Sequence, residues 1–177
     1  TGTCPHDGRV YTNGPFAGQF EYNPNCQSCF SHGEYWLTYP DGTSVNMHDL
    51  PEIKVHANKS MDEKKAFVQA VYARGIANEA NTGIPAALMA AQTFESGYGS
   101  SQSAVNKLNL YGLANYKFDS VSECIAYYEN LLTTRYSRLI GCDLRTWVYE
   151  IGPAGYCTEN PNYGDSLWGV ILYWDLN

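Results

Sequence analysis

Apolar and polar positions follow two different patterns along the chain, and the change falls near residue 58. Residues 1–57 are rich in Gly, Pro, Asn and Tyr and show little helical periodicity. Glu34 to Tyr39 is typical of a strand, Pro40-Asp41-Gly42 predicts a turn, and Thr43 to Met47 is placed to return antiparallel. We therefore predict a small N-terminal β-containing lobe, which either shapes a substrate cleft or only covers the core.

A long helix is predicted to begin at Ser60, where the pattern turns helical. Ser60, with Glu63 three residues later, forms a capping box. Four apolar residues then recur at helical spacing: Phe67, Val68, Val71 and Tyr72. The helix is expected to end near Asn81-Thr82-Gly83.

The next helix is predicted to be central and buried. Pro85 suits its first turn, and residues 86–91 are small and apolar throughout. Gly97 and Gly99 are expected to end it.

Three further helices are predicted in the last third of the chain. Residues 120–123 form a second capping box, which opens a helix to about Arg138. Asp143 is placed to cap a short helix that holds Trp147. The final helix is expected over Asp165–Leu176, with four apolar residues turned inward: Leu167, Trp168, Ile171 and Leu172. The predicted fold class is mainly α (α+β), with the lobe at residues 1–57 and a helical domain at residues 58–177.

Composition and charge exclude several classes of protein. Hydrophobic residues make up 44% of the 177 residues and charged residues only 16%, which allows a packed core and excludes a disordered polyampholyte. The formal charge of −7 argues against a nucleic-acid partner, because nucleic acid selects basic surfaces. The longest apolar runs are too short or too interrupted to span a bilayer, so we expect no membrane insertion. We also expect a monomer.

Six cysteines in a chain of this size indicate an oxidising compartment and predict disulfides. Three lie near the N-terminus and three after residue 123: Cys4, Cys26, Cys29, Cys124, Cys142 and Cys157. If all six pair, at least one bond must join the two groups and staple the lobe to the helices. A rival interpretation is a zinc site built from Cys4, Cys26, Cys29 and a nearby histidine, His6 or His32. Thr1-Gly2-Thr3-Cys4 resembles a mature N-terminus after processing, so we expect a secreted, extracellular protein.

Glu95 is the main candidate for chemistry. It lies between Phe94 and the turn Ser96-Gly97-Tyr98-Gly99, at the end of the predicted apolar helix. Apolar and aromatic surroundings disfavour the carboxylate anion and raise its pKa, which suits a glycosidase general acid. The 15 Tyr and 4 Trp residues add flat faces that suit sugar rings, although most of them are expected to pack the core. The alternative for Glu95 is a structural glutamate satisfied by backbone amides, and its local surroundings alone do not separate the two.

Four sequence blocks follow one another along the helical part of the chain. They are residues 84–101, which contain Glu95, then Asn109-Leu110-Tyr111-Gly112-Leu113, residues 118–125 and residues 155–163. In this order they resemble the glucosaminidase family, which includes bacterial autolysins and flagellar cell-wall hydrolases of the lysozyme-like superfamily. The first block is similar to the family's signature and the second to its Asn-Leu-Phe-Gly-Ile block. The third is similar to the block that leads into its next helix, and the fourth to its Tyr-Ala-Thr-Asp-Pro-Asn-Tyr block. The resemblance covers about residues 60–176, and it implies a lysozyme-like helical domain.

The resemblance also implies roles for individual residues. Glu95 falls on the catalytic glutamate of the family, and Tyr163 on a tyrosine that lines the active site and matters for activity. Four further residues are expected to contact substrate: Gln92, Tyr98, Tyr111 and Tyr156. Asn109 falls on a position that orders the following loop. We expect neither a metal nor a cofactor.

The chain departs from the family after the Asn109 block, where bacterial members carry a longer insertion. Only Ala114-Asn115-Tyr116-Lys117 separates Leu113 from Phe118, so a second carboxylate sought in that insertion has no counterpart. A retaining mechanism needs a nucleophile close to the acid, whereas an inverting one needs a more distant base with water between. Five acidic residues remain candidates for such a base: Asp41, Asp49, Glu52, Asp119 and Glu123. We therefore favour an inverting mechanism, or one in which Glu95 is the only essential carboxylate, over a retaining one.

The predicted function is hydrolysis of the bacterial cell-wall glycan. The partner is peptidoglycan, cut between N-acetylmuramic acid and N-acetylglucosamine. We favour muramidase (lysozyme-type) cleavage, because the many cysteines and the short connection fit a secreted eukaryotic relative, for example a fungal one, that attacks bacteria. The alternatives are endo-β-N-acetylglucosaminidase cleavage of the other linkage and a non-catalytic module that binds cell-wall glycan.

Overall fold

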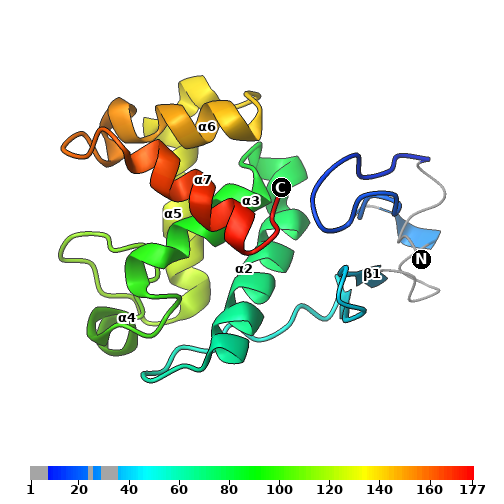
Figure 1. Ribbon diagram of the computed structural model, residues 1–177, viewed down its shortest axis with the longest axis horizontal. Coiled ribbons are helices and arrows are strands. Elements are labelled where there is room, and N and C mark those ends of the chain that lie inside the picture. Colours follow the sequence, from blue (N-terminus) through cyan, green and yellow to red (C-terminus); the bar gives the residue numbers. More distant parts are fainter. Residues whose placement is uncertain (1–7, 24–25, 29–35) are drawn as a thin grey trace.

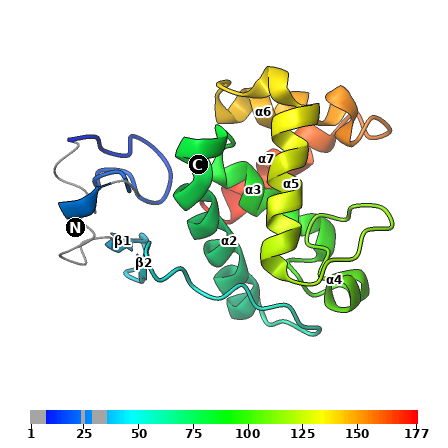
Figure 2. The same ribbon diagram turned by 180° about the vertical axis from the view of Figure 1, so that it is seen from behind.

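The structure is a computed structural model, and it describes residues 8–23, 26–28 and 36–177. Its helices gather in one body, and the described residues that precede them lie along one side of that body (Figures 1 and 2). Helices predominate, and a single two-stranded sheet completes the described part of the chain. The predicted mainly α class with a minor β element is therefore confirmed.

The first long helix, α2 (Met61–Thr82), has the predicted bounds and the predicted cap. The Glu63 backbone N–H donates to the Ser60 hydroxyl at 3.2 Å, and the Ser60 N–H donates to the Glu63 carboxylate at 3.1 Å. At the other end Gly83 adopts a left-handed φ of 71°, and its N–H donates to the Glu79 carbonyl at 2.8 Å. Local capping chemistry thus fixes both ends of this helix.

The central helix α3 (Ala86–Ala91) is shorter than predicted and is buried along its whole length. It contacts α2, α6 and α7, and all six of its side chains are within the core. Pro85 is its N-cap rather than a residue of its first turn. The chain continues directly into a 3₁₀ turn, η1 (Gln92–Ser96), which ends at Gly97 with a left-handed φ of 58°. This turn carries Glu95 from the core to its edge.

The remaining helical elements follow in chain order, and one α-helix among them was not predicted. They are α4 (Gln102–Lys107), α5 (Val121–Arg135), η2 (Ser137–Leu139), α6 (Leu144–Glu150), the π-type turn η3 (Gly152–Tyr156) and α7 (Tyr163–Tyr173). The unpredicted helix is α4, which is capped by the Ser101 hydroxyl. Asp143 caps α6 through the Thr146 N–H at 2.8 Å, as predicted.

Helices α5 and α7, like α3, differ from their predicted bounds. Helix α5 ends at Arg135, three residues early, and the Glu123 carboxylate accepts from the Asp119 N–H at 2.9 Å rather than from the cap residue. Helix α7 begins at Tyr163, two residues before the expected start, and ends at Tyr173, three residues before the expected end. Of the four residues predicted to face inward on α7, Leu167 and Ile171 are fully buried, but Leu172 is 57% exposed and Trp168 is only partly buried. Leu172 points outward because one helical step turns it about 100° away from Ile171.

The predicted hairpin is present in the N-terminal part. Strand β1 (Trp36–Thr38) pairs antiparallel with β2 (Ser44–Asn46), and the buried residues Leu37 and Val45 face each other in register. The turn between them closes through the Gly42 N–H and the Tyr39 carbonyl at 3.0 Å. Residues 34 and 35 of the predicted strand lie outside the described residues.

The described N-terminal residues pack on α2. Phe16 lies between Tyr39 and Tyr72, with ring centroids 4.7 Å and 5.6 Å apart. The Tyr39 hydroxyl donates to the Gln69 carbonyl at 3.2 Å, and Asp41 pairs with Lys65. These contacts place the hairpin on the side of α2 away from α5 (Figure 2). Of the two predicted roles for the lobe, the contacts fit the one in which it covers the core.

The predicted disulfide staple between the lobe and the helices is not supported. Cys124, Cys142 and Cys157 form no disulfide, and Cys4 and Cys29 lie outside the described residues. Cys124 is buried on α5, where its sulfur accepts the Leu110 N–H at 3.5 Å, so it lies within the helical core and across α2 from the hairpin. The rival zinc site also depends on residues outside the described ranges. None of the described helices is long and apolar enough to cross a membrane.

The close crossing of α2 and α3 gives a test of the packing. A Cβ atom on Gly75 would lie 2.9 Å from the Ala86 Cα, so the two backbones meet there without a side chain between them. We expect Gly75→Ala to lower the free energy of unfolding by about 1–3 kcal/mol, because overpacking outweighs the better helix propensity of alanine. Urea unfolding measures this change.

The matched control is Gly169→Ala on α7. Nothing lies within 4 Å of a Cβ atom added at Gly169, so this variant should gain up to about 1 kcal/mol from helix propensity. Equal stabilisation by both substitutions would show that the α2–α3 crossing is looser than described.

Candidate functional site

Glu95 lines a cavity of about 360 Å³. Three segments form its walls: the loop after α4, the last turns of α5 with the residue that follows it, and the end of η3. The lining residues are Glu95, Tyr111, Gly112, Leu113, Ala114, Leu131, Arg135, Tyr136, Gly155, Tyr156 and Cys157. Since these segments are far apart in sequence, only the folded helices bring them together around Glu95.

Glu95 is exposed, and it lines the cavity, but protein atoms take part of the solvent away from its carboxyl. Loss of solvent around it raises its pKa above the ordinary value, and a hydrogen bond from the Tyr163 hydroxyl opposes part of that rise. Gly112 approaches it closely, because a Cβ atom there would lie 3.3 Å from the Glu95 Cβ. Gly112 also has a left-handed φ of 64°. Among the described residues, the hydrogen bond found for this carboxyl comes from a side chain, Tyr163, and not from a backbone amide.

Three buried polar groups behind Glu95 form a hydrogen-bonded chain. The Tyr128 hydroxyl donates to the Gln92 side-chain oxygen, and the Gln92 amide nitrogen donates to the Tyr163 hydroxyl at 3.3 Å. Since the Tyr163 oxygen accepts from Gln92, its single proton is left to donate to Glu95. Gln92 is fully buried and Tyr163 is 3% exposed. Gln92 therefore acts on the site through Tyr163 rather than by facing the cavity.

Tyr111 and Tyr156 are both brought to the cavity, as the resemblance implied. The Tyr156 hydroxyl donates to the Tyr111 carbonyl at 2.9 Å, which ties the end of η3 to the loop after α4. The Tyr111 ring is buried and stacks on Tyr128 at 3.9 Å, and the Tyr156 ring lies 5.7 Å from Tyr163. Tyr111 thus contributes mainly its backbone to the wall, whereas Tyr156 contributes a partly buried ring.

Asn109 orders the loop after α4, as the resemblance implied. Its side-chain nitrogen donates to the Leu113 carbonyl at 2.5 Å and to the Tyr116 carbonyl at 3.3 Å. Its side-chain oxygen accepts from the Leu113 N–H at 3.0 Å. This one buried side-chain amide thereby provides hydrogen-bond partners for backbone groups of the loop.

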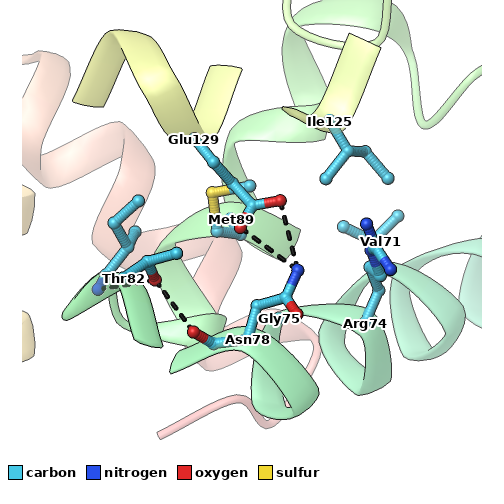
Figure 3. A pocket seen from close by; sticks show the side chains of 9 residues that line it. Val71, Arg74, Gly75, Asn78, Thr82, Met89, Ile125 and Glu129 are labelled. Atoms are coloured by element: carbon cyan, nitrogen blue, oxygen red, sulfur yellow. Dashed lines mark hydrogen bonds between the residues drawn. The ribbon is translucent and has the colours of Figure 1, made fainter. Parts of the chain in front are cut away.

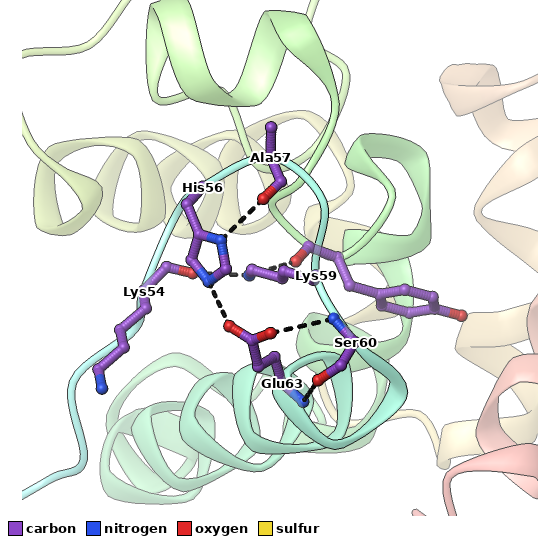
Figure 4. Close-up of polar contacts among 7 residues, drawn as sticks. Lys54, His56, Ala57, Lys59, Ser60 and Glu63 are labelled. Carbon is purple, nitrogen blue, oxygen red and sulfur yellow. Dashed lines mark hydrogen bonds and ion pairs between the residues drawn. The ribbon is translucent and has the colours of Figure 1, made fainter.

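Tyr98 lies outside the cavity, in the turn that follows Glu95. Its ring packs edge-on against Trp174 at 5.3 Å, and its carbonyl accepts from Lys59 at 2.6 Å. Lys59 also donates to the Lys54 carbonyl at 2.6 Å (Figure 4) and lies 3.8 Å above the Phe67 ring. Burial lowers the pKa of Lys59 to about 8. Tyr98 and Lys59 thus fix the turn behind Glu95.

A second carboxylate with a raised pKa, Glu129, has a structural position instead. Burial raises its pKa, but it faces a narrow pocket between α2 and α5, where Asn78 donates to both of its oxygens at 3.3 Å and 3.2 Å (Figure 3). The pocket is too small for a sugar, with room for about one water molecule. Glu129 therefore joins two helices, and it does not face the Glu95 cavity.

None of the five acidic candidates for a second catalytic group lines the Glu95 cavity. Asp41 pairs with Lys65 on the hairpin side, and Asp119 and Glu123 lie at the opposite end of α5 from Arg135. Glu52 lines a separate pocket beside Lys59. Within the described residues, the cavity lining contains one carboxylate, Glu95, and one cationic side chain, Arg135.

Arg135 and two glycines are site residues that sequence reasoning missed. Arg135 is exposed, and the ion pairs found in the described part of the chain do not include it. Gly155 has a φ of 134°, which residues with a side chain rarely adopt, and a Cβ atom on it would lie 3.6 Å from the Arg135 guanidinium, an ordinary van der Waals contact. Gly112 and Gly155 lie within the blocks that resemble the glucosaminidase family, and that resemblance was the signal that could have identified them. Arg135 lies outside those blocks, at the end of a helix with no distinguishing local pattern.

Comparison with known protein families gives one match, and the matched residues contain the whole lining of the cavity. The model of the glucosaminidase family, described as mannosyl-glycoprotein endo-beta-N-acetylglucosaminidase, matches residues 72–176. This span is more than half of the chain, and it contains Glu95 and every residue of the cavity lining. A comparison with curated proteins gave no match.

The raised pKa of Glu95 predicts that Glu95→Gln stabilises the folded protein at pH 7. Because the folded state holds the Glu95 proton more tightly than the unfolded chain does, the free energy of unfolding falls as the pH rises through the unfolded and then the folded pKa. A neutral glutamine removes that loss. Urea unfolding should therefore show a gain for Glu95→Gln at pH 7 and none at about pH 3, below both pKa values.

The matched control is Glu159→Gln, on an exposed residue outside the cavity, which should change stability little at either pH. A Glu95→Gln variant less stable than this control at pH 7 would contradict the desolvation of Glu95.

Proposed function

Since the chain belongs to the glucosaminidase family of lysozyme-like peptidoglycan hydrolases, we propose that it cleaves β-1,4 bonds of the peptidoglycan glycan strand with Glu95 as general acid. The observation that supports this best is the environment of Glu95. Its carboxyl opens into a cavity, carries a raised pKa and receives a hydrogen bond from Tyr163. A carboxyl that stays protonated at mildly acidic pH can protonate the oxygen of a leaving sugar.

Tyr163 is proposed to hold the acid in position. Its hydroxyl proton is directed at Glu95 because Gln92 occupies its acceptor side. This hydrogen bond favours the anion that remains once Glu95 has given its proton away, so it assists the transfer while burial favours the protonated starting state. The two influences together suit an acid that must be protonated before the reaction and stable after it.

We propose inversion at the anomeric carbon. Retaining enzymes place a carboxylate nucleophile about 5–5.5 Å from the acid, whereas the described lining of this cavity offers Glu95 alone. Water attacks the opposite face of the sugar, and its proton passes to solvent or to a base outside the described lining. Assistance by the acetamido group of the sugar is the other route that needs no second carboxylate.

Arg135 supports an anionic glycan as the substrate. In an alternating strand, one of the two sugars at every cleaved bond is N-acetylmuramic acid, which carries a lactyl carboxylate. Whichever linkage is cut, that carboxylate lies within one sugar of Glu95. Arg135 shares the cavity with Glu95 and has no ion-pair partner within the described residues. A guanidinium is well suited to pair with a carboxylate.

We also propose that the protein acts outside the cell, where its substrate lies, and that it has muramidase specificity. The non-catalytic alternative, a module that only binds cell-wall glycan, would need the cavity but not the acid. Endo-β-N-acetylglucosaminidase cleavage is the alternative within the same reaction class.

Glu95→Gln is expected to abolish hydrolysis while the fold persists. General acid catalysis contributes about 10²–10⁴-fold, so clearing of a bacterial cell-wall suspension should slow by at least about 100-fold. Circular dichroism checks that the variant is folded, and Glu159→Gln should clear at the wild-type rate. Wild-type clearing by folded Glu95→Gln would exclude Glu95 as the acid. A wild-type protein that binds the wall without releasing sugar ends would instead favour the binding module.

Cleavage of purified peptidoglycan is expected to create new reducing ends on muramic acid. Reduction of the digest with borohydride, followed by hydrolysis and sugar analysis, should yield the reduced form of muramic acid. Reduced glucosamine as the main product would overturn muramidase specificity in favour of the glucosaminidase linkage, and it would leave the role of Glu95 intact.

A further inference from the structure

Two tyrosines, one exposed and one partly buried, form a pair beside the cavity. Tyr116, on the short connection after the Asn109 block, is 44% exposed, and its ring centroid lies 4.7 Å from that of Tyr127 on α5. Phe118 is buried beneath both, at 6.1 Å from Tyr116 and 5.5 Å from Tyr127. The buried ring anchors the pair and leaves its outer surface open to solvent.

The pair continues the Glu95 cavity along two segments. Tyr127, Leu131 and Arg135 are spaced four residues apart on α5 and therefore share one face of that helix. Leu131 and Arg135 line the cavity, and Tyr127 lies one turn further along. On the facing loop, Leu113 and Ala114 line the cavity and Tyr116 follows two residues later. The aromatic surface is thus contiguous with the proposed active site.

The aromatic pair is also held in place before any ligand binds. The buried Asn109 side chain donates to the Tyr116 carbonyl at 3.3 Å, and the Tyr116 N–H donates to the Leu113 carbonyl at 3.4 Å. A surface that is ordered in advance loses little conformational entropy on binding.

We propose that Tyr116 and Tyr127 form a sugar-binding subsite that holds a distal residue of the same glycan strand whose scissile bond lies at Glu95. The inference rests on the proposed function, because a long strand is the ligand that would reach from Glu95 along α5. A pyranose ring has an apolar face of C–H groups and a polar edge of hydroxyls. The two tyrosines offer the matching surface, with flat rings and hydroxyl tips.

The chain-length dependence of binding tests this subsite. Full-length Glu95→Gln protein binds glycan strands without cutting them, and Tyr116→Ala and Tyr127→Ala are added to it singly. The ligands are peptide-free peptidoglycan strands, either long or limited to the disaccharide, with affinity measured by calorimetry. We expect each alanine to weaken the binding of long strands about fivefold and to leave disaccharide binding unchanged.

The matched control is Tyr173→Ala in the same background. Tyr173 is 66% exposed near the end of α7 and lines no part of the cavity, so its loss should change neither affinity. Unchanged long-strand affinity in Tyr116→Ala and Tyr127→Ala would overturn the subsite, and so would an equal loss for both ligand lengths. Failure of the proposed function would instead appear as hydrolysis that survives Glu95→Gln, which this binding assay does not measure.

Discussion

The burial of α3 is the constraint on which the rest of the structure depends. Its six side chains are small or apolar, and all of them lie in the core between α2, α6 and α7. Glycine at position 75 lets α2 approach its backbone directly. The helix has no exposed face. The chain therefore reaches the surface only beyond its C-terminal end, in the 3₁₀ turn that carries Glu95. The position of the proposed acid is therefore set by core packing rather than by a flexible loop.

The chemistry of the cavity follows from what surrounds that turn. Behind Glu95, Tyr128, Gln92 and Tyr163 pass hydrogen bonds in one direction, and the last proton in the chain is aimed at the carboxyl. In front of it, the cavity is open and holds the cation Arg135. A glutamate at this boundary meets both requirements of a general acid, since its proton is retained by desolvation and its anion is supported by a directed hydrogen bond.

Local signals in the sequence predicted most of the helices because capping is a local interaction. The Ser60 capping box, the Asp143 cap and the Gly83 stop each involve residues within a few positions of one another. The site was predictable only in part. Glu95 and Asn109 stood in recognisable blocks, whereas Arg135 reaches the cavity only because α5 packs beside the end of η3. Tyr98 was expected to contact substrate, but the left-handed turn at Gly97 and Tyr98 directs its ring toward Trp174 instead. The number of cysteines predicted disulfides but could not show which thiols the core would enclose. Cys124 lies within the core.

Protein atoms around Glu95 are proposed to keep its carboxyl protonated to a higher pH than a free side chain. A ¹³C NMR titration of the Glu95 carboxyl in the wild-type protein, assigned by comparison with Glu95→Gln, measures this directly. We predict a midpoint above the ordinary value of about 4.3 for glutamate. A midpoint at or below that value would contradict it, because the hydrogen bond from Tyr163 would then outweigh desolvation and Glu95 would be an anion under the conditions in which it must donate a proton.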